Sequence, residues 1–368
     1  MKIVELGQYI EQINNRNYDK RITVVKGLST KKEFRTPQSR VNLNELGNYK
    51  ILEYNNFAFV PTTDTWRCLA VALSKYDFPI VVSPIYCTFR ITDESALLPD
   101  FLYLWLTRPE IDRYARFHSW GSARENFNFA DMQRILIPLP DIEIQRQLVN
   151  VWEGLNRLKV DNDAQAEPLM GLCMSYLEKL RKEYEPVPLI HKIESCEGRN
   201  KEGLLTIENV RGISIAKAFI YSKANMEGVP LGNYKIVRPN EFAFVTVTSR
   251  NGEKISLAYN DSQEDYLVSA TYEVFRVITD DLLPEYLYLW FLRPEFDRYA
   301  RFHSWGSARE TFNMDDMKRV CIPIPDKSIQ QAIVDIFKCA KESKAISSEA
   351  EKLRKAVAPA LIQKAIHY

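Results

Sequence analysis

The chain has 368 residues, of which 46% are hydrophobic and 12% aromatic, with a formal net charge of +1 at pH 7. This composition excludes an intrinsically disordered chain and is sufficient for two domains, each with its own core. A strongly basic protein that binds nucleic acid by overall charge alone is also excluded. No apolar run approaches the roughly 20 residues of a transmembrane helix, and no signal peptide is recognised. We therefore expect a cytoplasmic protein without a membrane partner.

Residues 1–140 are predicted to form strands and turns followed by short helices. A helical pattern runs from 98 to 114, and Pro109 is well placed to begin a new first turn within it. A short helix is expected around 131–134, and the prolines of ILIPLP at 135–140 confine that run to an extended edge segment. The β-forming runs upstream of these helices are 22–25, 57–60, 80–82 and 86–91.

Two long helical segments are predicted, at 141–185 and at 326–368, each with a narrow apolar seam. Pro168 is expected either to start a second helix or to kink the first. Because a helix of this kind gains most of its stability by burying its apolar face, we expect the two segments to pack together as an antiparallel stalk. An unbroken helix of about 40 residues would span roughly 60 Å. The residues expected in the seam, as stalk or partner contacts, are Leu148, Trp152, Leu155, Ile333 and Phe337.

The strongest feature of the sequence is an internal repeat. The segment DRYARFHSWGSARE at Asp112–Glu125 recurs unchanged as Asp297–Glu310, and most positions of 98–149 match 283–334. Recent duplication alone would produce such identity, but the segments just upstream have diverged almost completely. The repeat therefore predicts one structural unit built twice. The expected fold is α+β and pseudo-two-fold symmetric, with two mixed α/β domains at opposite ends of the stalk: domains 1–140 and 186–325, helical regions 141–185 and 326–368.

Catalytic and metal-binding patterns are not found in the sequence. The six cysteines contain no CxxC pair and there are four histidines, which argues against a structural zinc site and a disulfide framework. No G-x-G-x-x-G, P-loop, G-x-S-x-G or H-E-x-x-H motif occurs. His118 and His303 lack an evident acid partner or nucleophile, so a contact or packing role is favoured over catalysis. We predict no catalytic residues, no metal site and no enzymatic activity of this chain.

The polar residues of the repeat match as well as the apolar ones, which indicates two copies of one binding surface. In Trp120–Arg124 the glycine permits a tight turn, while serine and arginine can donate to phosphates or base edges. The alternative is a buried tryptophan and an arginine paired with Glu125 or Asp112. For Trp120 and Trp305 burial is placed ahead of exposure.

The diverged segments are where the two domains can differ in recognition. Between residues 16 and 40 basic side chains outnumber acidic ones, and the segments 61–82 and 246–267 carry side chains suited to base edges. Ordinary surface loops remain the alternative for any single residue. The candidate DNA-contacting residues from the repeat and the diverged segments are Lys31, Lys32, Arg35, Arg40, Thr63, Arg67, Trp120, Ser122, Arg124, Thr248, Arg250, Asn251, Trp305, Ser307 and Arg309.

This organisation resembles the specificity (S) subunits of type I restriction–modification systems. The resemblance rests on the double occurrence of a GS turn, a short helix and an IPLP or IPIP strand leading into a glutamine-containing helix, at 121–145 and 306–330. It implies two target-recognition domains that read a split, asymmetric target in double-stranded DNA, one half per domain.

The resemblance also implies partners. Two methyltransferase (M) subunits and restriction/translocase (R) subunits would join this chain and carry S-adenosylmethionine, ATP and magnesium, so that the chain itself needs no cofactor. Three alternatives stay open: the specificity subunit of a related modification system without a separate translocase, a pseudo-symmetric structural adaptor, and an enzyme with an unrecognised site.

Overall fold

The computed structural model describes residues 2–38, 41–62, 68–121, 124–222, 228–248, 254–306 and 309–366. It divides into two compact units: the first unit is Met1–Asp161 with Ile346–Tyr368, and the second unit is Asn162–Ala345. Both units take in part of the two long helices. The domain boundaries expected near residues 140, 185 and 325 therefore stay a prediction.

The first unit is built around a four-stranded antiparallel sheet with the order β2-β9-β6-β7. Three two-stranded ladders, β1-β10, β3-β4 and β5-β8, complete it. Its elements are β1 (Lys2–Glu5), β2 (Ile10–Ile13), β3 (Gly27–Leu28), β4 (Phe34–Arg35), β5 (Lys50–Leu52), β6 (Phe57–Phe59), β7 (Val71–Leu73), β8 (Ile80–Val82), β9 (Cys87–Ile91), α1 (Pro99–Leu106), α2 (Pro109–Phe117), α3 (Phe129–Gln133), β10 (Leu136–Leu139) and the beginning of α4 (Ile142–Glu183).

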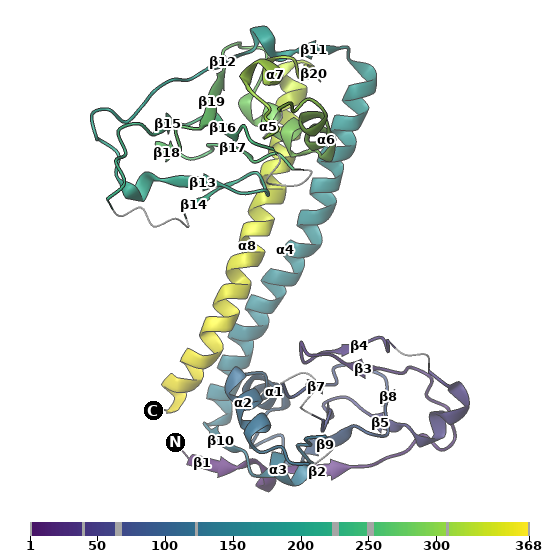
Figure 1. The fold of residues 1–368 in the computed structure, drawn as a ribbon. Helices are drawn as coiled ribbons and strands as arrows, with labels where there is room; N and C mark the ends of the chain where they lie inside the picture. Colours follow the sequence, from purple (N-terminus) through teal and green to yellow (C-terminus); the bar gives the residue numbers. More distant parts are fainter. Residues whose placement is uncertain are drawn as a thin grey trace. The chain divides into compact units, whose positions relative to one another are not determined.

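The second unit repeats this topology strand for strand. Its main sheet has the order β12-β19-β16-β17, and its ladders are β11-β20, β13-β14 and β15-β18. In each unit the short helices lie beside the long helices, and two ladders extend away from them, β3-β4 and β5-β8 in the first unit and β13-β14 and β15-β18 in the second (Figure 1). The elements are β11 (Pro186–Pro188), β12 (Ile193–Ser195), β13 (Arg211–Ile213), β14 (Phe219–Tyr221), β15 (Lys235–Val237), β16 (Glu241–Val245), β17 (Leu257–Tyr259), β18 (Tyr266–Val268), β19 (Tyr272–Val277), α5 (Pro284–Leu292), α6 (Pro294–Phe302), α7 (Met314–Lys318), β20 (Cys321–Pro323) and α8 (Lys327–Ile366).

The repeated FAFV segment explains how each sheet separates two cores. Successive side chains of a strand point to opposite faces, so Phe57 and Phe59 enter the large core under the helices while Ala58 enters a smaller one. Phe57 stacks on Phe89 with ring centroids 4.7 Å apart. In the second unit Phe242 stacks on Phe275 of β19 in the same way, with ring centroids 4.9 Å apart. The repeat thus encodes the scaffold of both units.

The long helices follow the predicted seam. α4 runs as one 42-residue helix through Pro168, so the expectation of a second helix starting there was wrong. Within the second unit, α4 and α8 pack side by side and antiparallel, because Asp163 pairs with Lys344 at 3.0 Å and the Cys173 thiol lies 3.8 Å from the Ile333 carbonyl.

The seam residues are largely buried in the chain itself. Leu148, Ile333 and Phe337 are buried, while Trp152 and Leu155 are half-buried. Within the first unit the Arg354 guanidinium lies over the Trp152 ring, 5.5 Å from its centre. The predicted α+β fold with long stalk helices is confirmed. Among the described residues, no helix is both long enough and apolar enough to cross a membrane.

Candidate nucleic-acid interface

Each unit displays an exposed aromatic pair at the repeated turn, defined as Phe117–Asn126 and Phe302–Thr311. Phe117 and Trp120 are 74% and 72% exposed, and Phe302 and Trp305 are 75% and 68% exposed. The expectation that both tryptophans are buried was wrong. The backbone of Trp120 pairs with that of Asn126 through hydrogen bonds of 3.2 and 3.0 Å. In this bridge the side chain of the preceding residue is buried and the indole points outward.

A glycine makes this turn possible. Gly121 has φ of +152° and Gly306 has φ of +144°, where residues with a Cβ are strained. A Cβ at Gly121 would lie 2.0 Å from the Arg124 carbonyl oxygen, and one at Gly306 would lie 2.2 Å from the Arg309 carbonyl oxygen. The turn therefore brings each glycine close to the backbone of its own chain.

The turn leaves one arginine of each unit available for a ligand. Glu125 forms an ion pair with Arg116, and Arg301 pairs with Glu310 in the same way. Arg124 and Arg309 are exposed, and neither has an ion-pair partner within the part of the chain that the structure describes. An exposed guanidinium beside an exposed indole can bind a phosphate or stack on a base. The candidates Ser122 and Ser307 lie outside the described residues.

The two histidines pack against aromatic rings. The ring centres of His118 and Tyr114 are 4.2 Å apart, as are those of His303 and Tyr299. Both histidines are half-buried. This placement favours the packing role expected from the sequence.

Two of the candidate DNA-contacting residues are corrected. Lys32 is only 5% exposed, and its ammonium lies 2.7 Å from Asp112 and donates to the Leu106 carbonyl at 2.8 Å. Thr248 is 2% exposed, and its hydroxyl lies 2.9 Å from the Ser304 hydroxyl. Both polar groups are satisfied inside the protein, which leaves them no free face for DNA.

Two of the remaining candidates in the diverged segments lie at or near the surface. Lys31 is exposed, and Arg35 is half-buried with its Nε donating to the Leu28 carbonyl at 3.1 Å. The candidates outside the described residues are Arg40, Thr63, Arg67, Arg250 and Asn251.

Sequence reasoning missed a cation–aromatic cluster on the small ladders of the second unit. The Arg211 guanidinium lies 4.3 Å from the ring centre of Tyr221 and 4.6 Å from that of Tyr266. Arg211 and Tyr221 are cross-strand partners, and Tyr221 is 76% exposed. The signal that could have revealed them is a basic residue and an aromatic residue on the two arms of one short hairpin.

The first unit carries a different cluster at the corresponding place. Lys26 lies over the Tyr76 ring at 5.1 Å, and Tyr76 contacts Phe34 and Phe78 with ring centres 6.2 and 5.5 Å away. Aromatic and cationic side chains of this kind form stacking platforms for nucleic-acid bases. The two units therefore share a scaffold but present different surfaces on their outer ladders.

The glutamine of the repeated motif holds each unit together. Gln145 is fully buried; its Oε1 accepts the Leu98 N–H at 2.9 Å, and its Nε2 donates to the carbonyls of Ala96 and Pro140, each at 2.9 Å. Gln330 makes the equivalent three bonds. One side chain thus joins the start of α1 or α5, the exit strand and the long helix.

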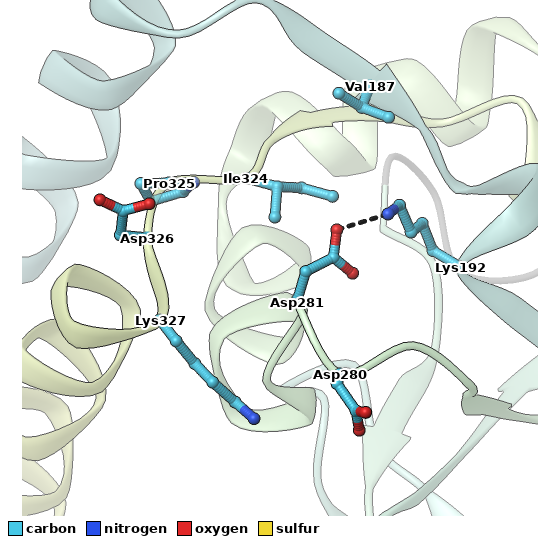
Figure 2. A pocket seen from close by; sticks show the side chains of 8 residues that line it. All are labelled: Val187, Lys192, Asp280, Asp281, Ile324, Pro325, Asp326 and Lys327. Atoms are coloured by element: carbon cyan, nitrogen blue, oxygen red, sulfur yellow. Dashed lines mark hydrogen bonds and ion pairs between the residues drawn. The ribbon is translucent and has the colours of Figure 1, made fainter.

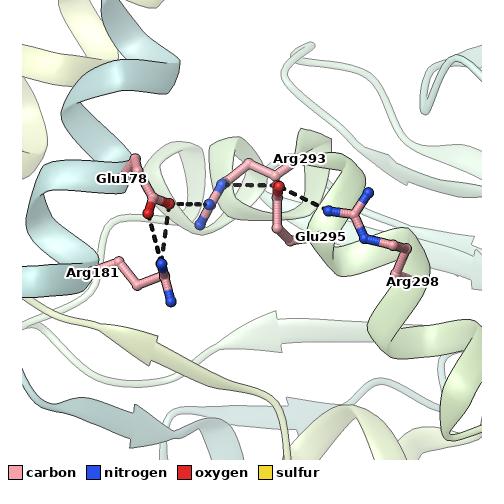
Figure 3. Close-up of polar contacts among 5 residues, drawn as sticks. All are labelled: Glu178, Arg181, Arg293, Glu295 and Arg298. Atoms are coloured by element: carbon pink, nitrogen blue, oxygen red, sulfur yellow. Dashed lines mark hydrogen bonds and ion pairs between the residues drawn. The ribbon is translucent and has the colours of Figure 1, made fainter.

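Ion pairs in the second unit tie the break between α5 and α6 to α4 (Figure 3). Glu178 of α4 lies 2.9 Å from Arg293, which also pairs with Glu295 at 3.4 Å. Glu295 continues the network to Arg298 at 3.0 Å. The Arg181 guanidinium, at 2.7 Å, holds the pKa of Glu178 below its ordinary value. These arginines are already paired, so they are weaker candidates for DNA than Arg309.

An open pocket of about 480 Å³ lies where β11 and β20 meet the start of α8 (Figure 2). Its lysine and aspartate side chains are partly paired with one another: Lys192 lies 2.5 Å from Asp281 and holds the pKa of that carboxyl below its ordinary value. Among the described residues, no cluster of histidine, cysteine and acidic side chains has a metal-binding arrangement. The pocket therefore shows mixed charge without a defined chemistry.

Comparison with known proteins relates this fold to one family. Residues 217–353 match the family model of the Type I restriction modification DNA specificity domain. The type I restriction–modification system S subunit from M. genitalium is 11% identical, with a TM-score of 0.62 over 99% of this chain and 95% of that chain. Among curated proteins, none matches this chain.

Two further solved structures are similar over nearly their full lengths. The HsdS subunit from Thermoanaerobacter tengcongensis is 17% identical, with a TM-score of 0.41 over 98% of this chain and 96% of that chain. A chain from a structure on complex assembly and conformational transition of the type I R-M system is also 17% identical, with a TM-score of 0.43 over 98% and 97%.

Residues 217–353 are thus similar to the DNA specificity domain of type I restriction–modification systems. The fold of the whole chain is similar to that of a type I S subunit.

Proposed function

We propose that this protein reads a split, asymmetric target in double-stranded DNA, one half with each unit, and has no catalytic activity of its own. The observation that carries this proposal is one scaffold with two different outer surfaces. Arg211, Tyr221 and Tyr266 form the cation–aromatic cluster of the second unit, where the first unit presents Lys26 over Tyr76. Two such surfaces would select two different half-targets.

The shared turn suits contacts that do not depend on sequence. Contacts to phosphates position a protein on DNA, whereas contacts to base edges specify the sequence. Arg124 and Arg309 stand at identical places with exposed side chains, so we assign them to the DNA backbone. The residues that remain candidates for DNA contact are Lys31, Arg35, Arg40, Thr63, Arg67, Trp120, Ser122, Arg124, Arg250, Asn251, Trp305, Ser307 and Arg309.

The long helices would recruit the partner subunits. On α4, Val151 and Leu158 are 47% and 50% exposed in the first unit, and Leu172 and Tyr176 are 46% and 41% exposed in the second. Exposed apolar side chains grouped on one element favour a protein partner. We propose that two methyltransferase (M) subunits bind there and that restriction/translocase (R) subunits join them. S-adenosylmethionine, ATP and magnesium would be bound by these partners.

DNA binding with and without the partner tests this proposal. Because the chain has a net charge of only +1, we expect the purified chain to bind DNA weakly, with an affinity that falls steeply with salt. Adding a methyltransferase (M) subunit of the same system should give tight binding to one split sequence. Fluorescence anisotropy with labelled duplexes measures both. Nanomolar sequence-specific binding by the chain alone would contradict the division of labour.

A charge variant identifies the backbone contacts. Arg124→Gln with Arg309→Gln should weaken binding of the complex to all duplexes alike and reduce the salt slope by about one per lost phosphate contact. Arg113→Gln with Arg298→Gln is the matched control, because both of these arginines already pair with a glutamate of their own helix. Equal effects of the two double variants would remove Arg124 and Arg309 from the interface.

A further inference from the structure

The turn of the β3-β4 hairpin, and of β13-β14, inserts a lysine into the protein. Lys32 and Lys217 both have positive φ, +64° and +62°, and are 5% and 3% exposed. Lys32 lies 2.7 Å from Asp112 of α2, and Lys217 forms an ion pair with Asp297 of α6. Burial lowers the pKa of the Lys217 ammonium below its ordinary value, and the carboxylate of Asp297 offsets part of this shift.

The same aspartate holds a second diverged segment. The Leu69 N–H donates to Asp112 at 3.0 Å, and the Ile255 N–H donates to Asp297 at 3.2 Å. Each carboxylate therefore joins a hairpin turn and the part of the diverged 61–82 or 246–267 segment just before β7 or β17 to the repeated helix.

In each unit a tyrosine hydroxyl also bonds to the backbone of this lysine. The Tyr103 hydroxyl donates to the Lys32 carbonyl at 2.8 Å, and the Tyr288 hydroxyl donates to the Lys217 carbonyl at 2.8 Å. The hairpin turn is thus held through both its side chain and its backbone in each unit.

The repetition of this pair in both units is informative because a buried ion pair is a poor choice for stability alone. A buried ion pair loses much of its attraction to desolvation, and apolar residues of similar size often stabilise a fold as well. The same lysine nevertheless occurs in the turn of both hairpins and pairs with the same aspartate of the repeated helix, although its neighbours Lys31 and Glu33 correspond to Ala216 and Ala218. Stability alone does not account for this choice, whereas a directional contact fixes the hairpin's position.

The hairpin of the second unit carries part of the surface that would read DNA. Arg211 and Tyr221 are on its two arms, next to Tyr266. We propose that Lys217 and Asp297, and likewise Lys32 and Asp112, are positioning residues that hold each unit's outer surface in one register on its half-target. This inference rests on the proposed function. Loss of the pair would relax base selection in one half of the target only.

A neutral double variant tests the proposal without leaving a buried charge. Lys217→Met with Asp297→Asn keeps the side-chain sizes, and the asparagine oxygen can still accept the Ile255 N–H. The variant is assembled with its methyltransferase and methylates a DNA library in which each half-target is randomised in turn. We expect about a tenfold loss of preference for the cognate bases in one half, with the other half read as in the wild type.

The exposed ion pair between Arg276 and Glu194, at 2.5 Å on neighbouring strands of the same unit, provides the matched control. Arg276→Met with Glu194→Gln should leave base selection in both halves of the target unchanged.

In the first unit, Lys32→Met with Asp112→Asn should relax base selection in the opposite half of the target. Tyr288→Phe removes only the hydroxyl that holds the Lys217 carbonyl, so it decides the question if the double variant fails to fold. It should relax the same half.

Three results would overturn the proposal. The first is a folded variant that reads both halves as the wild type does, and the second is equal relaxation of both halves, as expected of a merely structural role. In both cases the proposed function stands. The third is a wild-type complex that shows no split target, which overturns the proposed function and this inference together.

Discussion

Replacing Gln330 by leucine should destabilise the second unit by about 2 to 4 kcal/mol. Gln330 is fully buried, and its amide makes three bonds, to the Leu283 N–H at 2.9 Å and to the carbonyls of Asp281 and Pro325 at 2.7 and 2.8 Å. Leucine fills a similar volume but leaves one N–H and two carbonyls without partners. Each lost bond costs about 0.5 to 1.5 kcal/mol net, and a buried group left unsatisfied costs more.

The neighbouring Gln331 provides the control, because it is exposed and, among the described residues, its side chain bonds only to Asp335, at 2.7 Å. Gln331→Leu should change stability by less than about 0.5 kcal/mol. Hydrogen exchange measured by mass spectrometry separates the two units, which need not unfold together. Peptides covering 281–292 should lose protection in Gln330→Leu alone, with the first unit unchanged. Equal losses in both variants would refute the assignment of these bonds.

Three further predictions concern the repeated turn and the thiols. Gly306→Ala should lower the free energy of unfolding by more than about 1 kcal/mol, because the φ of this residue is +144°. Gly171→Ala, where a Cβ would meet open space, should raise it by about 0.5 to 1 kcal/mol. Thermal unfolding compares the two variants, and a change of the same sign in both would contradict the geometry. Trp305→Ala should leave the unfolding temperature nearly unchanged, since the side chain is 68% exposed. The same variant should bind DNA more weakly in a titration, and wild-type affinity would exclude this indole from the interface. Burial and, to a smaller extent, the nearby Glu241 carboxylate raise the pKa of the Cys196 thiol to about 12. At pH 8 iodoacetamide should therefore modify the exposed Cys339 much faster than Cys196. Similar modification rates of the two thiols, measured by mass spectrometry, would contradict this.

The scaffold could be predicted because its signals are local or repeated. The identical segment at 112–125 and 297–310 predicted a structural unit that occurs twice. Pro109 begins the second helix of the first unit, as its position predicted. Leu148 is buried in the seam as its helical spacing predicted. The run at 22–25, however, forms only an isolated bridge from Val25 to Val81, because strand propensity does not supply a neighbouring strand.

The candidate site was less predictable because exposure depends on distant partners. A lysine in a polar turn, such as Lys32, is normally solvated, and only Asp112, far along the chain, makes its burial possible. Trp120 would ordinarily be buried, but the pairing of its backbone with Asn126 turns it outward. The cluster of Arg211 with Tyr221 depends on a hairpin register that the sequence did not reveal.

The proposed function requires this chain to select the DNA sequence that a partner modifies. Single-molecule sequencing of genomic DNA, from cells with and without this gene that express an active partner methyltransferase, tests this directly. One split N6-methyladenine motif should disappear with the gene and return when the gene is restored. Unchanged methylation in the presence of an expressed, active methyltransferase would contradict it and favour a structural adaptor.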